Sequence, residues 1–341
     1  MLGSVVREIE TLVARLPVDL EVRVAGRAAA RQSGTRGNLM EGEADAACAP
    51  ACRLVVRLKG GIGNQMFQYA AALGVAIRNR VPLYLDSYTG FAKDAYERSF
   101  RLQCFKLSSP LLSRDECYDL WRKTRYIRAY RRYREQFRFE WLGRNFDPAL
   151  YSLRVRRDVL LEGNWQSPGF FEDVAGRVRE EFRIAPELSP ETRDVAEEIR
   201  AAPASISIHL RRLHGLSATG KRVANPYFIC DKEYYRAAIQ HIQRRAGPLE
   251  AFVFADGPFP PGELDLPCSV RIVDHNGPER EYEDLYLMSV CRHHVIANSS
   301  FSWWAAWLGR QEGTVVCAPA NFTPQKAPPI RDVYPSDWVV I

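Results

Sequence analysis

The stretch IHLRRLHG, residues 208–215, places a histidine and two adjacent arginines directly after an apolar run that is typical of a buried strand. Charged side chains are costly to bury unless a group of opposite charge meets them. His209 and Arg211 are two residues apart, so both side chains leave the same face of an extended segment. The guanidinium fork of arginine matches phosphate oxygens with two parallel hydrogen bonds. Arg211 and Arg212 are therefore candidates for binding phosphate, and the alternative is a structural contact with carboxylates.

Two more polar groups follow apolar runs of the same kind. Asp256 comes after one of them, at a turn, and the triplet Asn298-Ser299-Ser300 comes after another, directly before a helical stretch. Hydroxyl and amide groups at a helix start either hold a phosphate or simply cap the helix. Because ligands of open α/β sheets bind at the carboxyl ends of the strands, we expect these groups to face a ligand.

A glycine-rich turn, Gly60-Gly61-Ile62-Gly63, precedes a helical stretch. Glycine lets backbone N–H groups approach a ligand closely, and the start of a helix favours negative charge. The turn resembles the dinucleotide-binding pattern GxGxxG but has Met66 in the place of the third glycine. An enzyme that uses a nicotinamide cofactor is thus one alternative, and a glycine turn needed only for packing is another.

Strands and helices must position these groups, and their pattern predicts an α/β fold. The β-branched run 53–58, the glycine turn, the helical stretch 65–74 and the strand-like run 81–86 begin one α/β domain. A second alternation starts near residue 200, with strands expected at 205–210, 251–255, 270–273, 294–297 and 315–319 and helices at 231–245, 281–291 and 302–310. The pattern predicts two βαβ-type halves that meet near residue 200.

Composition bounds the function classes. The chain of 341 residues is 46% hydrophobic and 26% charged, which excludes a disordered or fibrous protein. A formal charge of +6 favours anionic partners such as nucleotides, phosphates or a membrane surface. The 8 cysteines have neither CxxC nor zinc-finger spacing, so we expect free thiols in a reducing compartment. No run reaches the roughly 18 apolar residues of a membrane span, and no secretory signal is present, so we expect a cytoplasmic protein.

Two segments differ from the rest of the chain. Residues 1–52 are rich in small residues and are expected to be a flexible extension, with Met40 as a plausible alternative start. Residues 122–138, RKTRYIRAYRRYREQFR, are strongly basic. They are interpreted as a solvated helix face or as a contact with an anionic membrane surface. No recognised nucleic-acid motif accompanies them, so we expect no nucleic-acid partner.

Longer motifs surround the candidate groups and carry a family resemblance. They are GGIGNQMFQYA (60–70), LEGNWQS (161–167), SIHLRR (207–212), CDKEYY (230–235), FVFADGP (252–258), EDLYLMSVCRHHVIANSSFSWWAAWL (283–308), VVCAP (315–319) and DVYPSDW (332–338). In this order they resemble the α-1,2-fucosyltransferases of glycosyltransferase family 11, of the bacterial type. The resemblance covers nearly everything from residue 54 to the end and leaves out residues 1–52.

The resemblance implies a GT-B architecture with two Rossmann-like domains that face a cleft. An N-terminal domain, 53–200, would take the acceptor, and a C-terminal domain, 201–341, would take the donor GDP-β-L-fucose. The implied reaction is inverting transfer of fucose to the 2-hydroxyl of a galactose-containing glycan, such as an O-antigen or another lipid-linked glycan, in the cytoplasm or at the inner face of the membrane. No cofactor or metal is implied, and the chain has no DxD motif or cluster with the spacing of metal ligands.

Residue roles follow from the implied reaction. Without a metal, fixed cations must stabilise the negative charge on the departing GDP, and we expect Arg211 to do so with support from Arg212 and His209. The resemblance implies that Asn298, Ser299 and Ser300 bind the diphosphate, that Asp256 and Asp284 read the nucleotide, and that Gly60, Gly61, Gly63, Asn64 and Gln65 lie near the fucose and the acceptor. Glu162 is a candidate for the general base, with a structural carboxylate as the alternative.

One motif departs from the family pattern. The family has HxRRGDY, whereas this chain continues from Arg212 with Leu213-His214-Gly215. The missing aspartate could orient the arginines or the acceptor, and His214 cannot replace a carboxylate at neutral pH. The alternative function is therefore a donor-binding protein with weak or lost catalysis.

Overall fold

The computed structural model describes residues 52–94, 96–126, 145–211, 213–216, 222–224, 230–257, 266–322 and 332–341, and the side chains of 123–126, 213–216 and 222–224 are outside the description. The chain divides into two units, Met1–Ala49 and Pro50–Ile341. The described residues all belong to the second unit. The predicted extension 1–52 therefore lies almost entirely outside them, as does 127–138 of the basic segment.

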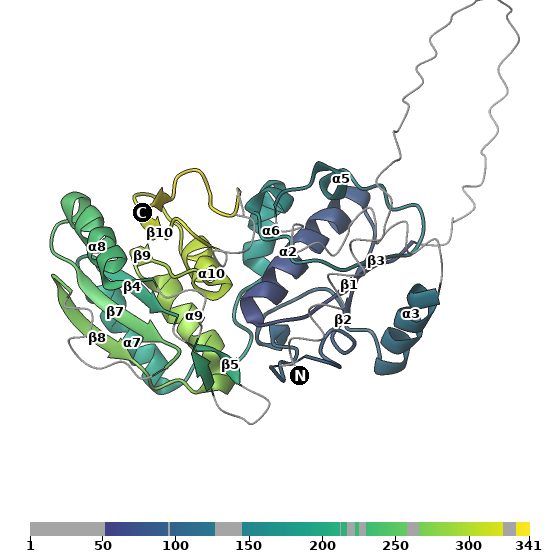
Figure 1. Ribbon diagram of the computed structural model, residues 1–341, viewed down its shortest axis with the longest axis horizontal. Coiled ribbons are helices and arrows are strands. Elements are labelled where there is room, and N and C mark those ends of the chain that lie inside the picture. Colours follow the sequence, from purple (N-terminus) through teal and green to yellow (C-terminus); the bar gives the residue numbers. More distant parts are fainter. Residues whose placement is uncertain are drawn as a thin grey trace, which may run out of the picture. The chain divides into compact units, whose positions relative to one another are not determined.

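The first sheet has three parallel strands in the order β2-β1-β3, namely β1 (Leu54–Arg57), β2 (Leu83–Asp86) and β3 (Val159–Leu161). Their runs are apolar because both faces of the sheet are covered. Leu54 and Val56 pack into the cluster that contains α2 (Ile62–Asn79), and Val55 packs on the other face against α3 (Arg114–Tyr126) (Figure 1).

Helix α2 is buried along most of its length. It begins after the N-cap Gly61 and ends where Arg80 adopts a left-handed conformation with a φ of 54°. Small residues such as Ala70, Ala71 and Ala72 let it lie deep in the protein. Among the described residues, the other helical pieces of this half are short: the helices α5 (Pro148–Tyr151) and α6 (Ala175–Glu181), and the 3-10 turns η1 (Leu102–Cys104), η2 (Pro168–Phe170) and η3 (Glu172–Val174).

The second sheet has six parallel strands in the order β11-β10-β9-β4-β7-β8. These are β4 (Ser205–Leu210), β7 (Glu250–Ala255), β8 (Ser269–Val273), β9 (His293–Val295), β10 (Val316–Ala318) and β11 (Val339–Val340). Numbered along the chain, they follow the order 3-2-1-4-5-6 of the Rossmann fold. A separate antiparallel pair, β5 (Leu213–Leu216) and β6 (Arg222–Ala224), follows β4.

Helices cover both faces of the second sheet. Ala251 and Val253 of β7 pack in the cluster of α8 (Lys232–Ala246), whereas Phe252 and Phe254 pack in the cluster of α7 (Pro190–Ala201), α9 (Glu281–Val290) and α10 (Ser300–Leu308). A 3-10 turn, η4 (Pro278–Arg280), precedes α9. Two parallel sheets wrapped by helices confirm the predicted α/β fold of the GT-B type.

The predicted boundary at residue 200 is not tested by this arrangement and stays a prediction. Helix α7 begins before that residue and runs through it to Ala201, and the Ser189 hydroxyl at its N-cap donates to Glu283 of α9 at 2.8 Å. Aromatic packing also joins the halves, because the ring centroid of Phe67 in α2 lies 4.5 Å from that of Trp303 and 4.9 Å from that of Trp304 in α10.

The cysteines and the helices bear on the expected compartment of the protein. The seven described cysteines have free thiols, as predicted. In the part of the chain that the structure describes, each helix is too short or too polar to cross a bilayer.

Candidate active site

The first turns of two helices meet, one from each half of the protein. A Cβ on Gly63 of α2 would lie only 2.5 Å from the carbonyl carbon of Ser300 in α10, so the two backbones touch. The indole Nε1 of Trp304 donates to the Gly63 carbonyl at 3.0 Å and fixes this contact. First-turn N–H groups have no partner within their own helix, and the helix dipole is positive at this end. Two such ends at one place favour an anion.

The second sheet directs its candidate residues to the same region. All six strands are parallel, but the order in which the chain adds them reverses between β4 and β9, and ligands of such sheets bind at the carboxyl ends of the strands there. His209 and Arg211 lie at the end of β4, and Asn298 to Ser300 follow β9. The structure thus brings the phosphate-binding candidates to the topological switch point.

Arg211 and Asp256 form an ion pair, with Arg211 Nη1 and Asp256 Oδ2 3.0 Å apart. The parallel register explains the contact, because Leu210 pairs with Ala255 and each charged residue comes next. The side chains are 29% and 19% exposed, so the guanidinium is held yet open to a ligand. Asp256 is therefore placed to orient Arg211, and its predicted role in reading the nucleotide stays a prediction.

His209 is buried and uncharged. Burial and the nearby Arg211 lower its pKa to about 3. Its ring lies 5.7 Å from that of Phe301 in α10, and its Nδ1 has no hydrogen-bond partner among the described residues. A neutral imidazole can exchange hydrogen bonds with a ligand but adds no positive charge. This differs from the expected support of Arg211 in stabilising charge.

Within the triplet Asn298-Ser299-Ser300, Ser299 caps α10, as the capping alternative predicted. The Ser299 hydroxyl accepts a hydrogen bond from the Phe301 N–H at 3.3 Å, as an N-cap residue does. Asn298 Oδ1 accepts from the thiol of Cys230 at 3.9 Å. Ser300 is half-buried, at the first position of the helix. Phosphate binding by these three residues stays a prediction that their place at the switch point favours.

A group of arginines near Arg211 was missed by sequence reasoning. Arg98 stacks on the ring of Tyr96, with Cζ 4.6 Å from the centroid, and burial together with the charge of Arg211 lowers the pKa of Arg98. Arg101 is ion-paired with Glu279 at 2.6 Å and Glu281 at 3.4 Å. Two guanidinium groups that repel each other in a half-buried place favour an anion there, and the carboxylates of Asp94 and Glu281 already supply part of that negative charge. Arg98 lies in an irregular segment, so no periodicity marked it.

The carboxyl of Asp284 has a raised pKa. Burial, with help from Glu283 and Glu281, raises the pKa of Asp284 to about 7, and its hydrogen bond from Asn276 opposes the rise. Asn276 Nδ2 donates to Asp284 Oδ1 at 2.9 Å and orients the group. Asp284 lies in the first turns of α9, which follows β8. Strongly shifted carboxyls gather at functional sites.

Glu162 lies in an ion cluster at the end of the first sheet. Its Oε1 is 2.9 Å from Arg57 Nη1 and 3.3 Å from Lys59 Nζ. Burial alone would raise the pKa of Glu162, but the two cations outweigh it, so the pKa is lowered. A carboxylate held in this way is a weak base, and the geometry favours the structural alternative. The role of general base stays a prediction.

The glycine turn is tied to its surroundings by Gln65. That side chain is fully buried, and its Nε2 donates to the carbonyls of Gly60 at 2.8 Å and Ser99 at 2.9 Å, while its Oε1 accepts from the Arg101 N–H. In this conformation the Gln65 amide holds the backbone of the glycine turn and of residues 99–101 in place. Gly60 has a φ of +79°, which favours glycine, and a Cβ on Gly61 would meet no atom within 4 Å.

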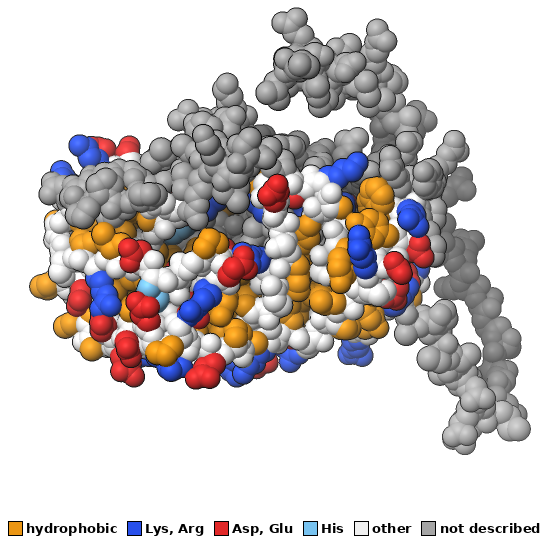
Figure 2. Space-filling view, turned by 90° about the horizontal axis from the view of Figure 1, so that it is seen from below, with side chains coloured by type: hydrophobic (Ala, Val, Ile, Leu, Met, Phe, Trp, Pro, Cys, Tyr) orange, Lys and Arg blue, Asp and Glu red, His pale blue; other side chains and the backbone are white. Residues whose placement is uncertain are grey.

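Some predicted residues lie outside the description. They are Arg212 and the side chains of residues 213–215, so the effect of the altered pattern stays a prediction. On the face that Figure 2 shows, the described positive and negative side chains are interspersed rather than gathered in a patch of one sign. Among the described residues there is no group of three or more His, Cys, Asp or Glu side chains suited to a metal ion. Independence from metal remains to be tested by experiment.

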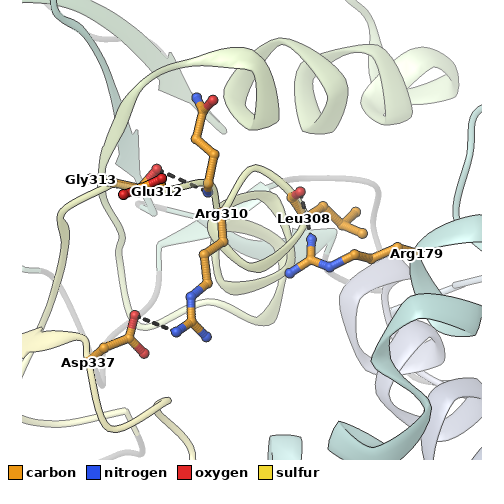
Figure 3. A pocket seen from close by; sticks show the side chains of 8 residues that line it. Arg179, Leu308, Arg310, Glu312, Gly313 and Asp337 are labelled. Atoms are coloured by element: carbon orange, nitrogen blue, oxygen red, sulfur yellow. Dashed lines mark hydrogen bonds and ion pairs between the residues drawn. The ribbon is translucent and has the colours of Figure 1, made fainter.

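An open hollow of about 680 Å³ lies elsewhere (Figure 3). It is at the C-terminal end of α10, where Arg179 donates to the Leu308 carbonyl at 2.8 Å and Arg310 pairs with Asp337 at 2.9 Å. Ser300 and Leu308 are at opposite ends of α10, about 12 Å apart along the helix axis. The hollow is therefore separate from the switch-point residues.

Comparison with known proteins gives matches over most of the chain. Residues 51–341 match the family described as Glycosyl transferase family 11. An α-1,2-colitosyltransferase of Escherichia coli is 27% identical over 298 residues, 84% of this chain and 98% of the relative. The O-antigen biosynthesis glycosyltransferase WbnK of Escherichia coli is 27% identical over 292 residues, 78% of this chain and 93% of the relative. A fucosyltransferase structure, NodZ from Bradyrhizobium, aligns with a TM-score of 0.46 and 16% identity, over 75% of this chain and 92% of that chain.

Proposed function

Because the chain belongs to glycosyltransferase family 11 and is a glycosyltransferase, we propose that it is an inverting galactoside α-1,2-L-fucosyltransferase. It transfers fucose from GDP-β-L-fucose to the 2-hydroxyl of a galactose-containing glycan. The acceptor oxygen attacks the anomeric carbon on the face opposite to GDP. The bond from that carbon to the phosphate oxygen breaks with its electron pair on GDP, and the hydroxyl proton passes to a base.

The observation that carries the proposal is the meeting of α2 and α10 beside Arg211. The transition state builds negative charge on the diphosphate, and fixed donors aimed at such charge are the largest single contribution in many enzymes. Two helix N-termini, the fork of Arg211 and the nearby Arg98 supply positive charge without a metal ion. The proposal therefore includes a reaction that needs neither metal nor cofactor.

The nucleotide fits the C-terminal ends of β7 and β8. Asp284 offers a carboxylate for guanine N–H groups, and Asn276 holds it in place. The acceptor and the fucose fit the first sheet, where Gly61 leaves open space and Asn64 stands in the first turn of α2. Glu162 is kept as the candidate base, to be tested by substitution.

A second donor is favoured by one relative. The relative named an α-1,2-colitosyltransferase aligns with 84% of this chain. Colitose is fucose without its 3-hydroxyl, so the two sugars differ at one position. The name of the other relative places it in O-antigen biosynthesis, which supports a bacterial surface glycan as the acceptor. Contact of residues 122–138 with an anionic membrane surface belongs to the same proposal, and most of that segment lies outside the described residues.

The test is a transfer assay on the purified chain. GDP-fucose and GDP-colitose are each incubated with a panel of β-galactosides in EDTA, GDP release is followed, and the linkage of the product is determined. We expect acceptor-dependent GDP release with an α-1,2 product and a loss of about 100- to 1,000-fold in Arg211→Ala. Arg193→Ala, which removes an exposed arginine paired with Glu187, is the matched control. Binding of GDP-fucose with no turnover across the panel would instead support the donor-binding alternative.

A further inference from the structure

Two amide side chains bond across the switch point of the first sheet. Asn64 stands in the helix that follows β1, and Gln166 lies in the segment that follows β3. In the order β2-β1-β3, the switch falls between these two strands. Gln166 Nε2 donates to Asn64 Oδ1 at 2.8 Å. The bond therefore spans the place where a ligand of this sheet is expected.

This bond fixes which end of the Asn64 amide faces outward. Because Oδ1 accepts from Gln166, Nδ2 is turned toward the glycine turn, 3.1 Å from the position of a Cβ on Gly60. No hydrogen bond among the described residues uses Asn64 Nδ2. At Gly61, which follows Gly60 in the glycine turn, an added Cβ would meet no atom within 4 Å. The two N–H donors of Asn64 thus lie at a glycine turn that leaves room for a ligand at Gly61.

The segment that carries Gln166 holds a strained backbone. Trp165 is buried and has a φ of +37°, which a bulky residue rarely adopts. Gly163 lies under its indole, because a Cβ there would be 2.4 Å from the ring. Between Gly163 and Trp165, Asn164 Oδ1 accepts from Gln68 Nε2 of α2 at 3.4 Å. The turn at Trp165 thus presents two amides, Asn164 and Gln166, to one helix. Such strain persists where the surroundings over-determine it and is often found at functional sites.

Gln166 is also only partly satisfied. The residue is 5% exposed, and its Oε1 has no hydrogen-bond partner among the described residues. Buried amide oxygens seldom lack a partner, and those that do call for an explanation beyond packing. Among the described residues, the Gln166 amide therefore has a free acceptor in addition to its bond to Asn64, so packing alone does not explain its burial.

We propose that Gln166 is a positioning residue that holds the Asn64 amide with its N–H donors toward an oxygen of the transferred sugar or of the acceptor. The inference deepens the proposed function and rests on it. Gln166 acts through Asn64 and needs no contact with the reacting atoms. The amide bond across the two strand ends also keeps the glycine turn and the segment after β3 in register around the ligand.

The test replaces the donor of the bond with an acceptor of the same shape. In Gln166→Glu the carboxylate cannot donate, so Asn64 turns its N–H groups toward it and its carbonyl toward the ligand. Gln166→Met removes both possibilities and leaves the Asn64 amide free to turn. For acceptor-dependent transfer at pH 8, we expect kcat to fall about 10-fold in the Met variant and about 100-fold in the Glu variant. The Kd of GDP should stay within about twofold, because GDP alone lacks the sugar and acceptor oxygens that Asn64 is proposed to bind.

Lower pH provides a readout that a purely structural role would not move. Burial raises the pKa of a carboxyl, so Glu at position 166 becomes protonated as the pH falls. A protonated carboxyl can again donate to Asn64. The kcat of Gln166→Glu relative to the native protein should therefore rise about 10-fold between pH 8 and pH 5.5, whereas the ratio for Gln166→Met should stay constant. Thermal unfolding at each pH checks that every protein remains folded.

An NMR measurement separates failure of the inference from failure of the proposed function. The side-chain amide signals of Asn64, identified by their loss in Asn64→Asp, should shift when GDP-fucose or a β-galactoside is added to the native protein. They should not shift in this way in Gln166→Glu. If the native protein shows no transfer but the Asn64 signals still shift with GDP-fucose or the β-galactoside, the proposed function is overturned and the inference is not. The inference would be overturned by a native kcat of Gln166→Glu at pH 8. It would also be overturned if the Asn64 signals of the native protein did not shift with either GDP-fucose or the β-galactoside.

Discussion

Gly63 and Ser300 are in backbone contact, and this contact joins the first turns of α2 and α10. It places the N-terminal end of a helix from the first sheet against the N-terminal end of a helix from the Rossmann-ordered sheet. The hydrogen bond from Trp304 to the Gly63 carbonyl and the packing of Phe67 on the two tryptophans hold it in place. The close approach of the two positive helix ends is therefore possible only because residue 63 is a glycine without a side chain.

Gly63→Ala should destabilise the protein. The added Cβ would lie 2.5 Å from the Ser300 carbonyl carbon and 2.7 Å from the Phe301 nitrogen, both backbone atoms that cannot move aside alone. Overpacking of this kind costs roughly 1–3 kcal/mol in the free energy of unfolding. Gly61→Ala is the matched control, since its φ is −73° and its Cβ would meet no atom within 4 Å. Chemical denaturation measures both, and equal stabilities would contradict the contact.

Asp284 should make donor binding depend on pH near neutrality. Its pKa is raised to about 7, so the carboxylate that guanine N–H groups need is present above pH 7 and disappears below it. We expect the affinity for GDP-fucose to fall up to about 10-fold as the pH drops from 8 to 6. GDP-fucose is the suitable probe because its diphosphate, esterified at both ends, does not titrate in this range. Isothermal titration calorimetry should give a flat profile for Asp284→Asn.

The same shift predicts an effect on stability. A carboxyl whose pKa is raised on folding binds its proton more tightly in the folded state, so the folded protein loses stability as the pH rises from about 4 to 7. Asp284→Asn removes this penalty and should unfold at higher temperature than the native protein at pH 8. The difference should vanish near pH 4. A native profile of donor affinity that does not change between pH 6 and 8 would remove Asp284 from the nucleotide site.

Sequence reasoning found the residues whose neighbours are set by the sheet. The pattern placed Arg211 and Asp256 each at the end of an expected strand, without predicting their contact, and the parallel register aligns the two. Element boundaries were less accurate. The helix expected at 65–74 is Ile62–Asn79, and the strand expected at 81–86 begins at Leu83, because Pro82 has no N–H for the ladder.

Contacts that arise only on packing could not be read from the pattern. The contact of α2 with α10 depends on how the two halves meet. The ion cluster joins Arg57 at the end of β1 and Lys59 beyond it to Glu162, which follows β3. The neutral state of His209 follows from burial, which the motif itself does not contain. Arg98 and Gln166 lie in irregular segments, where neither periodicity nor spacing predicts the direction of a side chain.

Arg98→Gln should weaken GDP binding without weakening the fold. Its guanidinium stacks on the ring of Tyr96, a contact worth about 0.5–1 kcal/mol, and its removal loses the attraction of Asp94 but relieves the repulsion from Arg211. We expect the melting temperature of the ligand-free protein to stay close to the native value and the Kd of GDP to rise about 10-fold at low salt, less at high salt. Arg193→Gln is the control. An unchanged Kd would show that Arg98 lies outside the anion site.

Glu162→Gln distinguishes a general base from a structural carboxylate. Removal of a base costs about 100- to 10,000-fold in kcat. The ion cluster with Arg57 and Lys59 predicts otherwise: kcat within about tenfold of native and a loss of about 1–3 kcal/mol in the free energy of unfolding. Because the pKa of Glu162 is lowered on folding, its stabilisation is present at pH 7 and is lost as the pH falls below about 4.

The control for this variant is Asp158→Asn, which breaks a more exposed ion pair with Arg53 beside the start of β3. Exposed pairs contribute about 0–1 kcal/mol, so this variant should remain near native in both stability and rate. Denaturation at pH 7, 5 and 4 together with transfer kinetics gives both quantities. A fall of 100-fold or more in the kcat of Glu162→Gln at native stability would assign the base to Glu162, since an ion pair that only supports the fold cannot remove rate without removing stability.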